Sequence, residues 1–272
     1  MIEDLVSIIV PTSNSSRFLE RCLQSVSKQT YSDVETIVVD NYSTDETRKI
    51  AERYCSKVVL CKGRRSEARN VGAGFANGEF LLSIDSDMEL TSGVVSESVA
   101  LAKSNSDAVI IPEFSIGEGF WASCRSLEKE CYIGDNSVEA ARFFKKRVFD
   151  VVGGYDDLLV FGEDWDLNQR TRMAHFKIGR VNALILHHEG ALSLRKAVVK
   201  KYDYSKTLKY YASKHPNEAS KQLNLMRPAF LRNWRKLAKD PVHTSGMFFM
   251  KFCEFAAGAI GVLSYKQTRQ MC

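Results

Sequence analysis

Short, largely apolar segments alternate with amphipathic ones along the first 112 residues of the chain. The apolar segments, which have the pattern of buried strands, lie at 5–10, 34–39, 57–61, 80–84 and 107–112. Helical periodicity is found between them, at 18–29, 45–55, 66–76 and 92–103. Strands that alternate with helices of this length predict an α/β fold with a doubly wound, mostly parallel sheet.

The rhythm changes after Pro112. A helical stretch at 121–131, a strand at 142–144 and a Gly-Gly turn at 153–154 precede an acidic run at 162–167. From Arg195 onward the sequence becomes helical, basic and aromatic. We therefore predict a basic helical extension after the α/β part.

The two parts of the chain carry opposite charge. Residues 1–194 hold 22 Lys and Arg against 29 Asp and Glu, a net charge of −7, whereas residues 195–272 hold 16 against four, a net charge of +12. Such asymmetry indicates an anionic partner for the extension, either a membrane or a nucleic acid. The apolar segment 246–263 favours the membrane as this partner, and no nucleic-acid partner is expected. Lys251 and Glu254 interrupt this segment, so a helix lying on the membrane surface is expected rather than a span; the alternative is packing against the catalytic part or in a homodimer.

The cysteines and the N-terminus favour a cytoplasmic protein. The seven cysteines are an odd number and show no metal-ligand spacing, as is typical of free thiols in a reducing compartment. The first four residues, Met-Ile-Glu-Asp, are acidic where an export signal needs positive charge. We expect location in the cytoplasm, on the inner face of the membrane.

Candidate chemistry lies at the ends of predicted elements. The apolar segment 80–84 runs into Asp85 and Asp87, and ligands of an open α/β sheet bind beyond such strand ends. Two carboxylates there suit Mg²⁺ or Mn²⁺, which binds diphosphates. The clusters 163–166 and 187–189 add further carboxylates and two imidazoles. Together they offer metal ligands and a candidate general base.

The order of the motifs resembles family 2 glycosyltransferases, which have the GT-A fold. The motifs are Val10-Pro11-Thr12, Val39 to Asp45, Ala68 to Gly72, Asp85-Ser86-Asp87, Val151 to Asp156, Gly162 to Leu167 and a turn at His187 to Gly190. The resemblance covers residues 5–193. It implies a catalytic domain at 1–194, with a nucleotide-sugar half (1–112) and an acceptor half (113–194), followed by the extension at 195–272.

The resemblance also implies roles for single residues. The donor-binding residues would be Pro11, Thr12, Asp40, Arg69, Asp85 and Ser86. Asp87 would ligate Mn²⁺ or Mg²⁺ directly, and Asp85 would reach the ribose or a metal-bound water. His187 is the expected third ligand, with His188 as the open alternative.

On the acceptor side, Asp164 matches the family's catalytic base, and Glu163 or Asp166 would orient the acceptor. The implied reaction is an inverting transfer from a nucleoside diphosphate sugar to a hydroxyl of a glycan or glycolipid. Two rivals remain: a sugar-nucleotide-binding module without catalysis, and a phosphatase of the haloacid dehalogenase type. The phosphatase is disfavoured because its Asp-x-Asp pair follows the first strand, whereas here the pair follows the fourth predicted strand.

Overall fold

A seven-stranded sheet forms the centre of the molecule. The computed structural model describes residues 1–224 and 227–264 and orders this sheet β3-β2-β1-β4-β8-β6-β9. Its strands are β1 (Ile2–Thr12), β2 (Val34–Asp40), β3 (Lys57–Leu60), β4 (Gly78–Ser83), β6 (Ala108–Ile110), β8 (Ala141–Lys145) and β9 (Ile178–Arg180). All neighbours pair in parallel except β8, which runs antiparallel to β4 and β6. The predicted α/β class with a mostly parallel sheet is confirmed.

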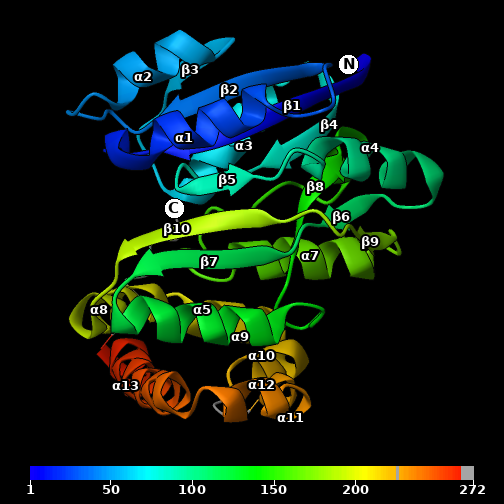
Figure 1. The fold of residues 1–272 in the computed structure, drawn as a ribbon. Helices are drawn as coiled ribbons and strands as arrows, with labels where there is room; N and C mark the ends of the chain where they lie inside the picture. The colour runs from blue at the N-terminus through cyan, green and yellow to red at the C-terminus, as the bar shows by residue number, and fades with distance from the viewer. Residues whose placement is uncertain (225–226, 265–272) are drawn as a thin grey trace.

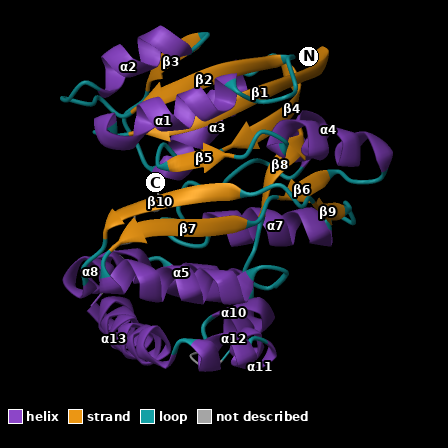
Figure 2. Cartoon of the chain, in the orientation of Figure 1, coloured by secondary structure: helices purple, strands orange, loops and turns teal. Residues whose placement is uncertain are grey.

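Helices cover both faces of this sheet (Figures 1 and 2). They are α1 (Ser16–Ser27), α2 (Thr47–Tyr54), α3 (Arg65–Phe75), α4 (Val94–Ser104), α6 (Lys146–Val151) and α7 (Glu163–Met173). Gly72 lets α3 lie close to β1, because a Cβ built there would come within 2.4 Å of Ile9. This close approach brings Arg69, one turn earlier, to the carboxyl ends of the strands.

A second, three-stranded sheet follows the order β5-β10-β7. Its strands are β5 (Met88–Leu90), β7 (Glu113–Glu118) and β10 (Ile185–Ala191). The turn expected at 187–190 is therefore wrong: these residues belong to β10, which pairs with β5 and β7. The polar sequence hid most of the strand: Ile185 at its start joins the apolar core, but His187 and His188 after it make polar contacts on opposite faces.

The extension forms helices that pack below the second sheet (Figure 1). They are α8 (Leu194–Ser205), α9 (Leu208–Lys214), α10 (Pro216–Gln222), α11 (Pro228–Arg232), α12 (Trp234–Lys239) and α13 (Pro241–Ser264). Helix α13 packs against α8 and against α5 (Phe120–Tyr132). The predicted helical extension is thus present, while residues 265–272, including Cys272, lie outside the described residues.

The two charges in α13 face the protein. Lys251 Nζ lies 2.7 Å from Glu128 Oε1 on α5, and Glu254 pairs with Arg125 on the same helix. Both α13 residues are only 8% exposed. Within the described residues, α13 is the one helix long and apolar enough to span a bilayer, yet 44% of its most apolar window is buried against the protein.

Candidate active site

The ends of β1 and β2 bring together two residues that are predicted to bind the nucleotide sugar. Their register pairs Thr12 with Asp40, and Thr12 Oγ1 donates to Asp40 Oδ1 at 3.1 Å. Ser43 donates to the same carboxylate from its hydroxyl and, at 3.0 Å, from its backbone N–H. Pro11 is buried just before Thr12 in β1. Because a carboxylate offers about four lone-pair sites, Asp40 retains capacity to accept from a ligand.

The loop between β4 and β5 separates the two carboxylates of the Asp-x-Asp motif. Asp85 accepts from Arg69 Nη2 at 2.7 Å and lies 3.4 Å from Arg65 Nη1. Burial raises the pKa of Asp85, but these guanidinium groups outweigh it and hold the pKa well below the usual range. Asp87 instead faces the second sheet, where its Oδ2 lies 3.3 Å from His187 Nε2. Between them, the Ser86 hydroxyl lies 2.9 Å from that of Ser15.

Arg69 lies at the centre of the carboxylates and is completely buried. Its Nη1 donates to Asp164 Oδ1 at 2.7 Å and lies 3.4 Å from Glu163 Oε1. Its guanidinium also stacks 5.0 Å from the centre of the Tyr155 ring. The resemblance implies a contact with the diphosphate or base, whereas the structure surrounds Arg69 with protein groups.

The acidic run begins helix α7. Gly162 precedes the helix with φ of +81°, a left-handed conformation that favours glycine. Glu163 and Asp164 follow in the first turn, with side chains 4% and 24% exposed respectively. Burial raises the pKa of Glu163 despite the opposing charge of Arg65, whose Nη2 lies 2.7 Å away. Of the two carboxylates, Asp164 is therefore the one open to a ligand.

Asp166 is turned away from this centre. Its side chain is completely buried and contacts His215 at 2.8 Å, Lys214 at 2.7 Å and Arg170 at 2.7 Å. These partners belong to α7 and to the helical extension. Asp166 thus joins the extension to the catalytic part and is not placed to orient an acceptor.

Alternation along β10 places the two histidines in different surroundings. His187 lies between Asp87 and Glu113, with its Nδ1 3.7 Å from Glu113 Oε2. Burial lowers the pKa of His187, but the two carboxylates outweigh it and raise the pKa to about 9. His188 Nε2 lies 2.8 Å from Glu89 instead. The geometry therefore selects His187 as the imidazole beside Asp87.

Several polar residues of the site were not anticipated. Glu113, at the start of β7, lies 2.6 Å from Arg142 and 3.3 Å from Lys129. Arg142 also approaches Asp164 Oδ2 at 3.9 Å. The one sequence signal was that Glu113 directly follows Pro112 at a strand end, and no motif spacing links it to the others.

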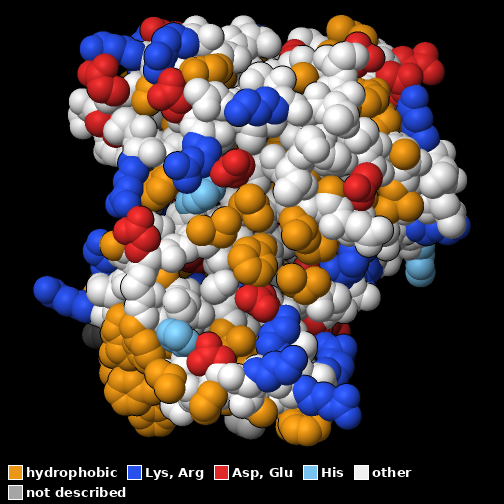
Figure 3. Space-filling view, in the orientation of Figure 1, with side chains coloured by type: hydrophobic (Ala, Val, Ile, Leu, Met, Phe, Trp, Pro, Cys, Tyr) orange, Lys and Arg blue, Asp and Glu red, His pale blue; other side chains and the backbone are white. Residues whose placement is uncertain are grey.

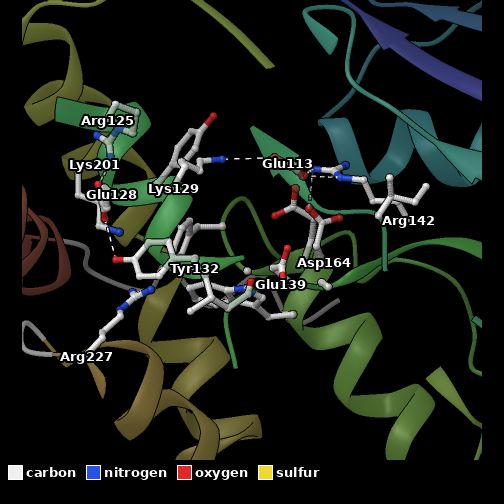
Figure 4. Close-up of a pocket in the computed structure, with 18 of the residues that line it drawn as sticks. Glu113, Arg125, Glu128, Lys129, Tyr132, Glu139, Arg142, Asp164, Lys201 and Arg227 are labelled. Carbon is white, nitrogen blue, oxygen red and sulfur yellow. Dashed lines mark hydrogen bonds and ion pairs between the residues drawn. The ribbon is translucent and has the colours of Figure 1, made fainter. Parts of the chain in front are cut away.

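These groups line a pocket of about 310 Å³ (Figure 4). Glu113, Arg142 and Asp164 form one end of it, and α5 forms its wall with Lys129 and Tyr132. The pocket thus extends from the carboxylate of Asp164 toward the helical extension. We call it the acceptor pocket, after the role proposed for it below.

Asp87 and His187 offer a carboxylate oxygen and an imidazole nitrogen, which are suitable ligand atoms for a divalent metal. Asp87 Oδ1 is buried without a hydrogen-bond partner among the described residues, and the imidazole of His187 lies beside the same carboxylate. No group of three metal-ligating side chains is found in the described residues. The pair nevertheless fits Mn²⁺ or Mg²⁺, because a metal that coordinates phosphate groups usually takes only one or two protein ligands. Substrate oxygens and water would supply the others.

Solved structures of glycosyltransferases share this fold. The mannosyltransferase PcManGT from Pyrobaculum calidifontis, in complex with GDP-Man and Mn²⁺, superposes with a TM-score of 0.66 at 18% identity, covering 96% of this chain and 88% of that one. Staphylococcus aureus TarS 1–349, in complex with UDP-GlcNAc, gives 0.54 at 18% identity, covering 98% and 93%.

Sequence relatives carry similar names. A PGL/p-HBAD biosynthesis glycosyltransferase of Mycobacterium bovis is 28% identical over 201 residues, 67% of this chain and 78% of that protein. Glycosyltransferase GlyG of Streptococcus pneumoniae is 33% identical over 93 residues, 32% of this chain and 31% of GlyG. The match to the poly(ribitol-phosphate) β-N-acetylglucosaminyltransferase TarS of Staphylococcus aureus, at 35% over 115 residues, spans 39% of this chain and only 20% of TarS.

Comparison with a protein-family model agrees with the solved structures and with the sequence relatives. The sequence model described as "Glycosyl transferase family 2" matches residues 7–155, more than half of the 272 residues, and includes the strand ends that carry Asp40 and the Asp85–Asp87 loop. The chain belongs to glycosyl transferase family 2.

Proposed function

We propose that this protein transfers a sugar from a nucleoside diphosphate sugar to an acceptor hydroxyl, in a single displacement that inverts the anomeric configuration. The observation that carries the proposal is the position of Asp164, which lines the acceptor pocket. It is linked through Arg69 to Asp85 in the loop between β4 and β5, which we call the donor loop. An acceptor hydroxyl has a pKa far above 7, so its attack requires a carboxylate that takes its proton.

Asp164 has one oxygen suited to this role. Its Oδ1 accepts from Arg69 at 2.7 Å, whereas its Oδ2 lies 3.9 Å from Arg142, beyond hydrogen-bond distance. We assign Oδ2 as the atom that receives the proton. Glu163 pairs with Arg65, which also lines the pocket. Its proposed role is to position this arginine and not to contact the acceptor.

The donor would bind across the strand ends. Thr12 and Asp40, after Pro11, are assigned to the nucleoside, and Asp85 and Ser86 to the ribose and diphosphate side. Asp87 and His187 would hold Mn²⁺ or Mg²⁺, an ion that when bound neutralises the charge developing on the departing diphosphate. Support comes from the orphaned Asp87 oxygen and from the GDP-Man and Mn²⁺ bound in PcManGT.

The proposed role of Asp164 as base limits the kind of acceptor. A polyprenyl phosphate is already anionic at neutral pH and would not need Asp164 to remove a proton. We therefore propose a hydroxyl-bearing glycan or glycolipid as acceptor.

Helix α13 presents an apolar face to solvent. Its charged residues face inward, while Val242, Phe249, Phe252, Phe255, Ile260 and Leu263 are each between 52% and 79% exposed. Figure 3 shows hydrophobic side chains gathered at the end of the molecule where Figure 1 draws α13. Exposed apolar patches of this kind mark interaction surfaces.

We propose that this face lies on the cytoplasmic surface of a membrane. The neighbouring α11 and α12 region exposes Arg232, Arg235, Lys236 and Lys239 together with Trp234, which is 60% exposed. Cations beside an apolar face suit anionic lipid head groups, and tryptophan prefers the membrane interface. Such attachment would place the acceptor pocket near a lipid-linked acceptor; dimerisation through α13 is the competing arrangement.

Nucleotide release tests the reaction. The protein is incubated with UDP-sugars and GDP-sugars, with Mn²⁺ or with chelator, and free nucleotide and inorganic phosphate are measured. We expect metal-dependent release of nucleoside diphosphate from one donor class. Binding without release would indicate the non-catalytic module, and release of inorganic phosphate would indicate a phosphatase.

A further inference from the structure

The end of the acceptor pocket farthest from Asp164 carries two cations that have no carboxylate partner among the described residues. Lys201, on α8, and Arg227, just before α11, both line this end (Figure 4). In the described part of the chain, Lys201 forms no ion pair, and its Nζ lies 4.4 Å from the centre of the Phe161 ring. Arg227 stacks 4.8 Å from the centre of the Tyr132 ring and donates to the carbonyl of Gln222.

The other charges nearby are already paired. Arg125 contacts both Glu128 and Glu254, and Lys251 contacts Glu128 at 2.7 Å. Arg125 and Lys251 thus have carboxylate partners, whereas no ion pair of Lys201 or Arg227 is found among the described residues. Both side chains are only partly exposed, and a bound anion would compensate their charge.

Two further observations point to a ligand. Arg227 Nε is buried without a hydrogen-bond partner among the described residues. Burial lowers the pKa of Lys201 to about 8, with Glu254 opposing and Lys251 and Arg227 adding to the shift. A bound dianion would satisfy the guanidinium and favour the charged ammonium.

Lys201 also lies against the proposed membrane helix. A Cβ built at Gly258 of α13 would be 3.9 Å from Lys201 Cγ, so the lysine stem packs on the inner face of that helix. The opposite face of α13 carries Phe252 and Phe255, 61% and 52% exposed. The cationic end of the pocket is thus the end nearest to the proposed lipid surface.

We propose that Lys201 and Arg227 bind the diphosphate group that links the acceptor sugar to its lipid. This assignment rests on the proposed function. The sugar hydroxyl would lie at Asp164 and the linking phosphates at the cation pair, while the lipid would leave the pocket beside α13. Ligand pockets commonly measure about 300–1,000 Å³, so one of about 310 Å³ holds only the acceptor's terminal part.

Binding of geranyl diphosphate in the presence of EDTA tests the site. The chelator prevents metal-dependent binding at the donor loop, and the probe carries the proposed diphosphate and the start of a lipid. We expect the full chain to bind this probe in calorimetric titration and the double variant Lys201→Met/Arg227→Met to bind at least tenfold more weakly. The matched control is Arg195→Met/Lys196→Met, which removes two exposed cations of α8 and should bind like the unmodified protein.

Three measurements separate this proposal from others. The melting temperature of Lys201→Met/Arg227→Met should be unchanged or raised, because uncompensated charge has been removed; a marked fall would mean that the two cations are structural and would overturn the assignment. A soluble phosphodiester such as glycerophosphoglycerol should bind at least tenfold more weakly than geranyl diphosphate, and equal binding would exclude the lipid-linked class. Nucleoside diphosphate binding with Mn²⁺ should be the same in the double variant and the unmodified protein.

The two failures can be told apart. If the unmodified chain binds no nucleoside diphosphate with Mn²⁺, the proposed glycosyl transfer fails whatever the probe does. If it binds nucleotide but not geranyl diphosphate, or if the double variant binds the probe unchanged, only the phosphate site is wrong.

Discussion

Arg69 Nη1 donates to Asp164 Oδ1 at 2.7 Å, across 95 residues of chain, and no part of the arginine reaches solvent. The other arm of the guanidinium holds Asp85 at the same distance. One buried side chain therefore joins the loop that carries the predicted metal ligand to the helix that carries the candidate base. In the proposed reaction, the relative position of donor and acceptor would depend on it.

Replacing Arg69 by Met should destabilise the fold by about 3–5 kcal/mol, because Asp85, Glu163 and Asp164 would lose their shared buried cation. Urea unfolding followed by circular dichroism measures the change. The control is Arg48→Met, an exposed pair with Glu52, for which a loss below about 1 kcal/mol is expected. Equal losses in the two variants would contradict the central role of Arg69.

Asp87→Asn and His187→Ala should each abolish the dependence of nucleotide binding on Mn²⁺. The first removes the negative charge of the carboxylate and the second removes the imidazole nitrogen from the pair that is proposed to hold the ion. The matched controls are Glu89→Gln and His188→Ala, which disrupt the neighbouring pair on the other side of β10 and should keep the metal effect. Titration of nucleoside diphosphate with and without Mn²⁺ measures this, and unchanged affinity in Asp87→Asn would refute the assignment.

Asp164→Asn should lower kcat by about 10²–10⁴, the usual cost of removing a general base, while donor affinity stays nearly constant. The amide keeps the size of the side chain but cannot take the proton. Steady-state transfer rates and donor titration are compared on the same preparation. A loss of donor affinity would instead assign Asp164 to the donor site, and efficient transfer by this variant to a bare polyprenyl phosphate would exclude the hydroxyl-acceptor proposal.

Stability should fall in acid as Glu128 becomes protonated. Burial raises the pKa of this carboxyl, but Lys251 and Arg125 outweigh it and hold the pKa well below the usual 4.5. A depressed pKa contributes stability that is present above the unfolded value and is lost as the pH falls below it. The free energy of unfolding should therefore drop below about pH 4.5. Glu128→Gln should be less stable at pH 7 and show a flatter profile, whereas exposed Glu52→Gln should leave the profile unchanged.

Co-sedimentation with anionic liposomes tests the membrane face. We expect binding that weakens with salt but persists, because charge attraction is screened while apolar burial is not. The variant Phe249→Ser/Phe252→Ser/Phe255→Ser should be released completely at high salt. Removing Arg235, Lys236 and Lys239 should instead reduce binding at low salt. A full-length protein that stays in the supernatant at both salt concentrations would leave α13 as a packing or dimerisation helix.

The alternation of apolar strands and helices was enough to predict the α/β sheet and, with the motif order, the family. This was possible because strand and helix periodicity are local properties, and because parallel strands place their carboxyl ends at one edge whatever the details of packing. The grouping of Thr12 with Asp40 follows from that rule and needed no coordinates.

Two features of this protein, strand β10 and the buried charges of α13, became visible only in the tertiary structure. The strand β10 carries polar residues on both faces, so its continuation past Leu186 was not visible in the sequence, and only the folded chain places His187, the expected ligand, rather than His188 beside Asp87. In α13, Lys251 and Glu254 looked like interruptions of an apolar segment; they are its buried face, because Glu128 and Arg125 lie more than 100 residues away in sequence but directly opposite in space. Ion pairs between distant segments leave no periodic signal, and only the folded chain reveals them.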